Sequence, residues 1–63
     1  MAQANLTYEE WVEEITNSLA NKMSISTSDA QALVGTQQFE IDNAWNLDLS
    51  AIDAAESIAE NLK

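Results

Sequence analysis

The chain has 63 residues, with eleven Asp and Glu against two Lys, and its net charge is −9. Proteins that bind nucleic acids or anionic membranes use basic side chains, so this balance disfavours both as direct partners. Cysteine and histidine are absent, which excludes disulfides, the commonest metal ligand and the commonest general base.

A chain of this size forms one domain around a single small core. Its apolar fraction of 46% is ordinary for a folded domain, so the acidity is not a sign of disorder. No stretch approaches the ~18 consecutive apolar residues of a transmembrane helix, and the start MAQANLTYEE lacks the pattern of a secretory signal. We therefore expect a cytoplasmic protein.

The first predicted helix begins after Thr7. This residue occupies an N-cap position, and Glu10 follows at the spacing of a capping box. Apolar residues then recur at intervals of three and four, as on one face of an α-helix. They are Tyr8, Trp11, Val12, Ile15, Leu19 and Met23. The pattern predicts a helix over residues 8–23.

The segment SISTSDAQ is a polar break that precedes a second helix. Ser28 is its predicted N-cap, with Gln31 at the capping-box position. The pattern predicts one helix over residues 29–46. The residues of its inner face are Ala30, Leu33, Val34, Ile41, Ala44 and Trp45.

Phe39 does not share this inner face, because on the same helix it lies nearer Ala32 and Gly35. Either Gly35 bends or breaks the helix and reorients Phe39, or Phe39 packs on a separate surface. A single glycine costs a helix only about 1 kcal/mol relative to alanine. We therefore predict an unbroken helix.

The connection LDLS leads to a third helix, for which Ser50 is the predicted N-cap. This helix is predicted over residues 51–62. Its inner face consists of Ile52, Ala55, Ile58, Ala59 and Leu62. The three segments predict an all-α fold, a small three-helix bundle that forms one domain over residues 1–63.

The sequence contains no motif of an enzyme or of a metal site. General acid–base catalysis needs a carboxyl group of raised pKa in a pocket, and so short a chain has little room for one. A calcium loop of the D-x-D-x-D-G type and a glycine-rich phosphate loop are both absent. We expect no catalytic residue, no metal ligand and no cofactor.

Four glutamates form the densest group of charge on the first predicted helix: Glu9, Glu10, Glu13 and Glu14. At 1.5 Å per residue they span about 7.5 Å, or about one charge per 2 Å. Duplex DNA carries about one charge per 1.7 Å. Acids near a helix N-terminus also suit the helix dipole and keep a protein soluble. The group is therefore either a solvated helix face or a surface that imitates a nucleic acid.

The aromatic residues are predicted to divide between core and surface. Trp11 and Trp45 lie on predicted inner faces, so we expect both in the core. Phe39 lies off the main apolar stripe, and it is the better candidate for an interface with a partner.

Several segments together resemble short hypothetical proteins of bacteriophages and mobile elements. The first helix carries YEEWV, the second begins with Ser-Asp-Ala-Gln, and an Ala-Trp pair leads through a short turn into an Ala-Ala helix. Such proteins often have glycine in the turn after the tryptophan, where this chain has Asn46 and Leu47. The resemblance implies a phage accessory function, such as inhibition of a host defence complex in the host cytoplasm.

The leading hypothesis is a non-enzymatic acidic interaction protein that blocks a basic, nucleic-acid-binding host complex, such as a CRISPR, restriction or transcription component. Its partner would be the basic protein surface of that complex. The predicted partner-binding residues are Glu9, Glu10, Glu13, Glu14, Phe39, Glu40, Asp42, Asp53 and Glu56. The alternative is a structural or assembly module, a homodimer that buries Phe39, since domains below ~80 residues often gain stability by self-association.

Overall fold

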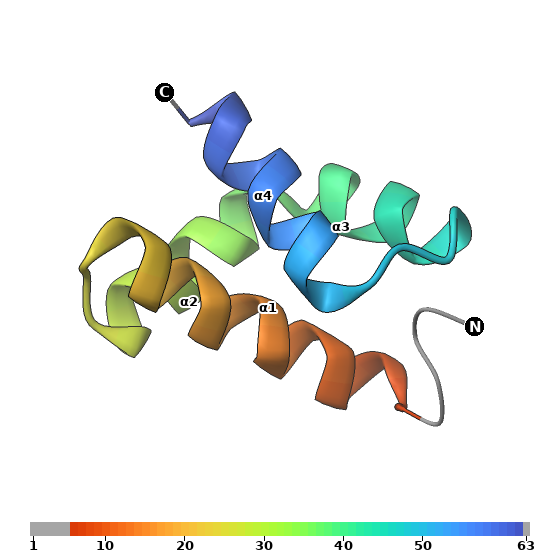
Figure 1. Cartoon of the computed structure of the whole chain (residues 1–63), viewed down its shortest axis with the longest axis horizontal. Coiled ribbons are helices and arrows are strands. Elements are labelled where there is room, and N and C mark those ends of the chain that lie inside the picture. Colours follow the sequence, from red (N-terminus) through yellow and green to blue (C-terminus); the bar gives the residue numbers. More distant parts are fainter. Residues whose placement is uncertain (1–5, 63) are drawn as a thin grey trace.

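The computed structural model describes residues 6–62, and within this range the chain forms four helices and no strand. The helices are α1 (Tyr8–Met23), α2 (Thr27–Thr36), α3 (Gln38–Asn46) and α4 (Ala51–Asn61). Figure 1 shows α1 along one side of the molecule, with α4 packed across its middle. The predicted all-α class is confirmed. The predicted number of three helices is wrong, because the segment predicted as one helix over residues 29–46 forms two.

α1 has the predicted bounds and the predicted capping box. The Glu10 N–H donates to Thr7 Oγ1 at 3.1 Å, and the Thr7 N–H donates to Glu10 Oε1 at 3.0 Å. Trp11, Ile15 and Leu19 are completely buried. Met23, predicted on the same inner face, is 37% exposed because α1 ends there and turns at the left-handed residue Ser24.

α2 begins earlier than predicted. Its N-cap is Ser26, whose side chain accepts the Asp29 N–H at 3.1 Å, whereas the sequence pattern favoured Ser28. Ile25, the residue before the cap, packs against the core. This contact fixes the entry of the chain, so the first serine after Ile25 takes the capping position and Ser28 joins the first turn.

The predicted long helix is broken at Gln37, whose φ of −109° and ψ of 29° are not helical. Gly35 has no positive φ, so the break does not depend on the special conformational freedom of glycine. An unbroken helix of this length would extend about 27 Å, close to the 28 Å length of the whole molecule. The break lets α2 pack on α1 while α3 packs on α4.

α4 is capped by Ser50 as predicted, since the Ser50 side chain accepts the Asp53 N–H at 3.1 Å. The inner face of the helix is rotated from the predicted one. Ile52 is 65% exposed, which corrects its placement in the core. The buried residues of α4 are Ala51, Ala54, Ala55 and Ile58. Small alanine side chains permit close approach to the large side chains of α1, and this favours the observed rotation.

The apolar core contains an aromatic cluster at the N-terminal end of α1. The ring centroid of Trp45 lies 5.2 Å from that of Tyr8 and 5.1 Å from that of Trp11, both in edge-to-face geometry. Trp11 is completely buried, and its Nε1–H donates to the Leu49 carbonyl at 3.0 Å. Trp45 is half-buried. The expectation of two core tryptophans is confirmed for Trp11, whereas Trp45 lies at the core edge.

Candidate functional site

The four glutamates of α1 lie on two different flanks of the helix. Glu9 and Glu13, one turn apart, line a groove between α1 and α2. Glu14 lines a hollow on the opposite flank, together with Ser18 of α1 and Ile52 of α4. The predicted acidic face is therefore real as an exposed surface, but it divides between the α2 side and the α4 side.

Glu10 has a structural contact in addition to its exposed position. Its carboxylate accepts the backbone N–H of Thr7. This hydrogen bond, aided by the Thr7 side chain, lowers the pKa of Glu10 below its ordinary value. The capping box therefore keeps Glu10 ionised, with its charge at the positive end of the helix dipole.

A second row of carboxylates runs along α4. Asp53, Glu56 and Glu60 follow at spacings of three and four, so they share one exposed face of the helix. Lys22 of α1 approaches this row, with Nζ 3.9 Å from Glu56 Oε1. Both side chains are largely exposed, so this ion pair is weak and leaves the row predominantly negative.

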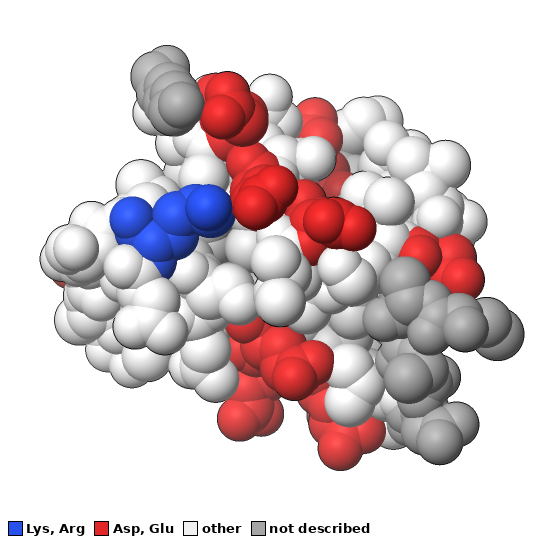
Figure 2. All heavy atoms as spheres, viewed as in Figure 1, with Lys and Arg blue, Asp and Glu red and all other residues white. Residues whose placement is uncertain are grey.

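One face of the molecule shows both groups of carboxylates at once (Figure 2). Acidic side chains lie over α1 and over α4, with an uncharged band between them. Between α1 and the start of α4, a hollow is lined by Glu14 together with the uncharged residues Leu6, Ser18, Ser50, Ala51 and Ile52. Ile52 is the large exposed apolar side chain of this hollow.

The predicted acidic residues of α3 lie in other surroundings. Asp42 Oδ1 accepts the Tyr8 hydroxyl at 2.8 Å and Gln38 Nε2 at 2.9 Å, which ties α3 to the start of α1. Burial, and after it the hydrogen bond to Asp42, raises the pKa of Tyr8. Glu40 lines a small groove between α3 and α4. Asp42 thus has a stabilising contact within the fold, whatever its role toward a partner.

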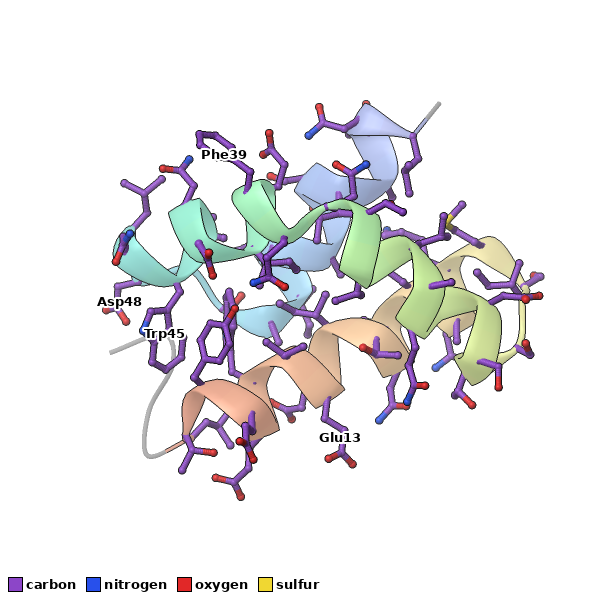
Figure 3. All side chains as sticks on the ribbon, turned by 180° about the vertical axis from the view of Figure 1, so that it is seen from behind. Glu13, Phe39, Trp45 and Asp48 are labelled. Atoms are coloured by element: carbon purple, nitrogen blue, oxygen red, sulfur yellow. The ribbon has the colours of Figure 1, made fainter. Side chains whose placement is uncertain are left out.

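Phe39 is 82% exposed, as expected for a residue outside the main apolar stripe. Figure 3 places it at the opposite edge of the molecule from Glu13. A partner with one flat surface cannot contact both residues. The structure therefore does not gather all the predicted partner-binding residues into one site.

Two features of the surface were not recognised in the sequence. The exposure of Ile52 was missed because the alanines of α4 fit an inner face at another rotation. Asp48 has a positive φ of 59°, and among residues 6–62 its buried Oδ1 has no hydrogen-bond partner. The left-handed conformation of Asp48 could have been expected from its place in a predicted turn, since Asp is among the residues that tolerate this conformation.

The exposed carboxylates suit electrostatic attraction of a cationic partner. Within residues 6–62 no three acidic side chains converge closely enough to hold a metal ion. No helix in the same range has the length and apolarity needed to cross a membrane.

No protein-family model, curated protein or solved structure matches this chain. The relation to bacteriophage proteins stays a prediction.

Proposed function

We propose that this chain is a non-enzymatic acidic interaction protein that binds a basic protein surface in place of a nucleic acid. The observation that carries the proposal is that one face of the molecule presents carboxylates over α1 and, beyond uncharged side chains, carboxylates over α4. Only two lysines in the whole chain oppose eleven carboxylates.

Neighbouring packed helices have a spacing similar to the width of a nucleic-acid groove. Packed helices lie about 8–10 Å apart, which falls between the widths of the minor and major grooves, about 6 and 12 Å. Carboxylates on two neighbouring helices therefore imitate two phosphate strands across a groove. Such a surface attracts a basic cleft over a long range, and added salt weakens the attraction.

The partners that this chemistry suits are proteins with a basic cleft for nucleic acid, such as a nuclease, a polymerase or a CRISPR-type surveillance complex. A bacteriophage inhibitor that acts in the host cytoplasm would have this role. Ile52, exposed in the hollow between α1 and the start of α4, would supply the apolar contact that limits release of the partner.

Affinity capture from a bacterial lysate, followed by competition, tests the proposal. The captured protein should be released both by duplex DNA and by raised salt, because DNA and this chain compete for one basic surface. Capture of a protein that duplex DNA does not displace would contradict nucleic-acid mimicry.

Three double variants locate the contact, and each removes two negative charges. Glu13→Gln with Glu14→Gln removes one charge from each flank of α1, and Glu56→Gln with Glu60→Gln removes two charges from the α4 row. Both should reduce capture. Asp29→Asn with Glu40→Gln is the matched control, and capture should persist. An equal loss in all three variants would show that only net charge matters.

A second candidate is the homodimer, and the exposure of Phe39 is the observation that favours it. Leu47, which directly follows α3, is also a large exposed apolar residue. Light scattering over a dilution series separates the two candidates. A chain that stays monomeric at every concentration with its helix content intact excludes an obligate dimer, and Phe39→Asp should abolish any dimer that forms.

A further inference from the structure

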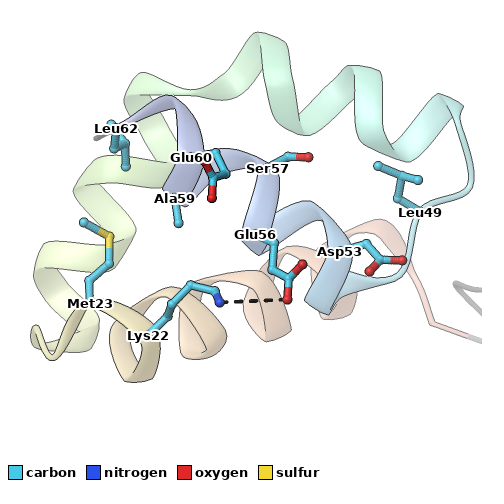
Figure 4. A pocket seen from close by; sticks show the side chains of 9 residues that line it. All are labelled: Lys22, Met23, Leu49, Asp53, Glu56, Ser57, Ala59, Glu60 and Leu62. Atoms are coloured by element: carbon cyan, nitrogen blue, oxygen red, sulfur yellow. Dashed lines mark ion pairs between the residues drawn. The ribbon is translucent and has the colours of Figure 1, made fainter.

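A shallow groove of about 850 Å³ extends over α4, between the C-terminal end of α1 and the connection from α3 to α4 (Figure 4). Its lining combines two kinds of side chain. The apolar ones are Met23, Leu49, Ala59 and Leu62. The charged ones are Lys22, Asp53, Glu56 and Glu60.

The charged side chains that line this groove are mainly acidic. They are three carboxylates and one ammonium group. The Lys22 ammonium lies 3.9 Å from the Glu56 carboxylate, and both side chains are exposed, so a cation of a partner can displace Lys22 from Glu56. A partner that supplies cations would complement this acidic lining.

The apolar part of the groove can receive a side chain from a partner. Met23 is 37% exposed, and its flexible thioether can adapt to different shapes. Ala59 is small and half-buried, so a partner can approach α4 closely beside it. Leu62 is also half-buried and adds apolar surface at the end of the helix.

The acidic residues recur with the period of a helix. Asp53, Glu56 and Glu60 follow at spacings of three and four and rise about 10.5 Å along the axis of α4. Lysines or arginines at the same spacings on a second helix rise by the same distance. An amphipathic helix laid beside α4 would therefore present its cations to this row and its apolar face to the floor of the groove.

We propose that this groove is the docking site for a Lys- or Arg-rich amphipathic helix of a partner protein. The inference rests on the proposed function, in which the chain binds a basic protein surface. It adds the site and the kind of segment: one helix of the partner lies along α4, with apolar side chains on Met23 and Leu62 and cations against Asp53, Glu56 and Glu60.

A pair of synthetic peptides tests the inference on the whole chain. One is an amphipathic helix with leucines on one face and lysines on the other. The second has the same composition in a scrambled order, so that both residue types surround the helix. In fluorescence anisotropy at physiological salt, the amphipathic peptide should bind roughly tenfold more tightly than the scrambled one. Equal affinity of the two peptides would overturn the proposal.

Matched variants assign the peptide to the groove. Glu56→Gln with Glu60→Gln should weaken binding of the amphipathic peptide by roughly tenfold. Asp29→Asn with Glu40→Gln removes the same charge outside the groove and should leave the affinity nearly unchanged. Lys22→Gln should strengthen binding, because it removes the competing cation. Met23→Ala should weaken it through faster release.

The peptide and capture experiments distinguish failure of the docking site from failure of the proposed function. If both double variants weaken the peptide equally, the groove is not the site, although the chain still binds cationic partners. If the amphipathic peptide does not bind while a basic protein is still captured from lysate, the helical docking site is excluded and the proposed function stands. If neither is bound, both proposals are overturned.

Discussion

Phe39 and Ile41 are separated by one residue, yet their side chains have opposite roles in α3. Phe39 is 82% exposed, whereas Ile41 is completely buried among residues of the core. We expect Ile41→Ala to lower the free energy of unfolding by about 2–5 kcal/mol, since it leaves a cavity. Phe39→Ala should change it by only about 0.5 kcal/mol or less.

Urea denaturation followed by circular dichroism measures both values. Comparable destabilisation by the two variants would mean that Phe39 belongs to the core. The sequence predicted the difference in exposure between Phe39 and Ile41 correctly, because on a helix wheel Phe39 falls outside the face that carries Ile41. It did not predict the exposure of Ile52, since large apolar residues usually mark the inner face and here the alanines of α4 occupy it.

Tyr8 is the single tyrosine of the chain, so its ionisation can be followed without interference from another. Burial raises its pKa, and the nearby Asp42 carboxylate raises it further. Asp42→Asn removes the negative charge beside the phenol and should lower the pKa of Tyr8. Absorbance at alkaline pH measures this shift. Asp29→Asn is the control, and the pKa of Tyr8 should not change in that variant.

Ionisation of Tyr8 also lowers the stability of the fold at alkaline pH. The folded pKa of Tyr8 is raised, so its contribution to stability is complete below the unfolded value of about 10. The contribution is lost as pH rises through the folded value, because the unfolded chain ionises first. An unchanged pKa of Tyr8 in Asp42→Asn would show that burial alone produces the shift.

At the scale of the helices, Gly35 is a site where stability can be increased. It is exposed within α2, has no positive φ, and a Cβ atom there would meet nothing within 4 Å. Gly35→Ala should therefore raise the free energy of unfolding by about 0.5–1 kcal/mol, since alanine loses less conformational entropy in a helix. Thermal denaturation followed by circular dichroism measures the gain.

Ala32→Gly is the matched control in the same helix. Ala32 is also exposed, and its replacement should cost about 0.5–1 kcal/mol. If Gly35→Ala were destabilising, the break at Gln37 would depend on the freedom of Gly35 after all. The two variants together therefore test the cause of the break.

Two helix starts, at Thr7 and Ser50, were predictable from local signals, whereas the cap at Ser26 and the break at Gln37 depend on tertiary packing. The capping box at Thr7 and the N-cap at Ser50 are local signals, and the structure confirms both. The break at Gln37 has no such signal, because no side chain caps the start of α3. It follows from the separate partners of α2 and α3, which only the folded chain defines.

At the scale of the whole molecule, the amount of charge was evident from composition, but its distribution was not. Helical periodicity places Glu13 and Glu14 on exposed positions of α1. It does not say which neighbouring helix lies on each flank. The division of the α1 glutamates between the α2 and α4 sides therefore depends on how the helices pack, and that arrangement brings carboxylates of α1 and α4 to one face of the molecule.

The net charge of −9 also bears on stability, through two opposing effects. The acidic residues in the first turns of the helices interact favourably with the helix dipoles. They are Glu9, Glu10, Asp29, Glu40 and Asp53. Such contacts are weak at exposed positions and are screened by salt. Against them, two carboxylates 15 Å apart repel by about 0.3 kcal/mol in water, and eleven carboxylates form about fifty such pairs. We expect repulsion to dominate.

Added salt should therefore stabilise the protein. The screening length is about 30 Å in 0.01 M salt and about 8 Å in 0.15 M salt. The molecule measures 28 × 18 × 16 Å, so at the lower concentration almost every pair of carboxylates interacts and at the higher one only neighbours do. Melting curves at pH 7 should show a higher Tm in 0.15 M sodium chloride, by about 4–8 °C for each kcal/mol gained. Glu13→Gln with Glu14→Gln should reduce this rise. A Tm that falls with salt would mean that the helix-dipole contacts outweigh the repulsion.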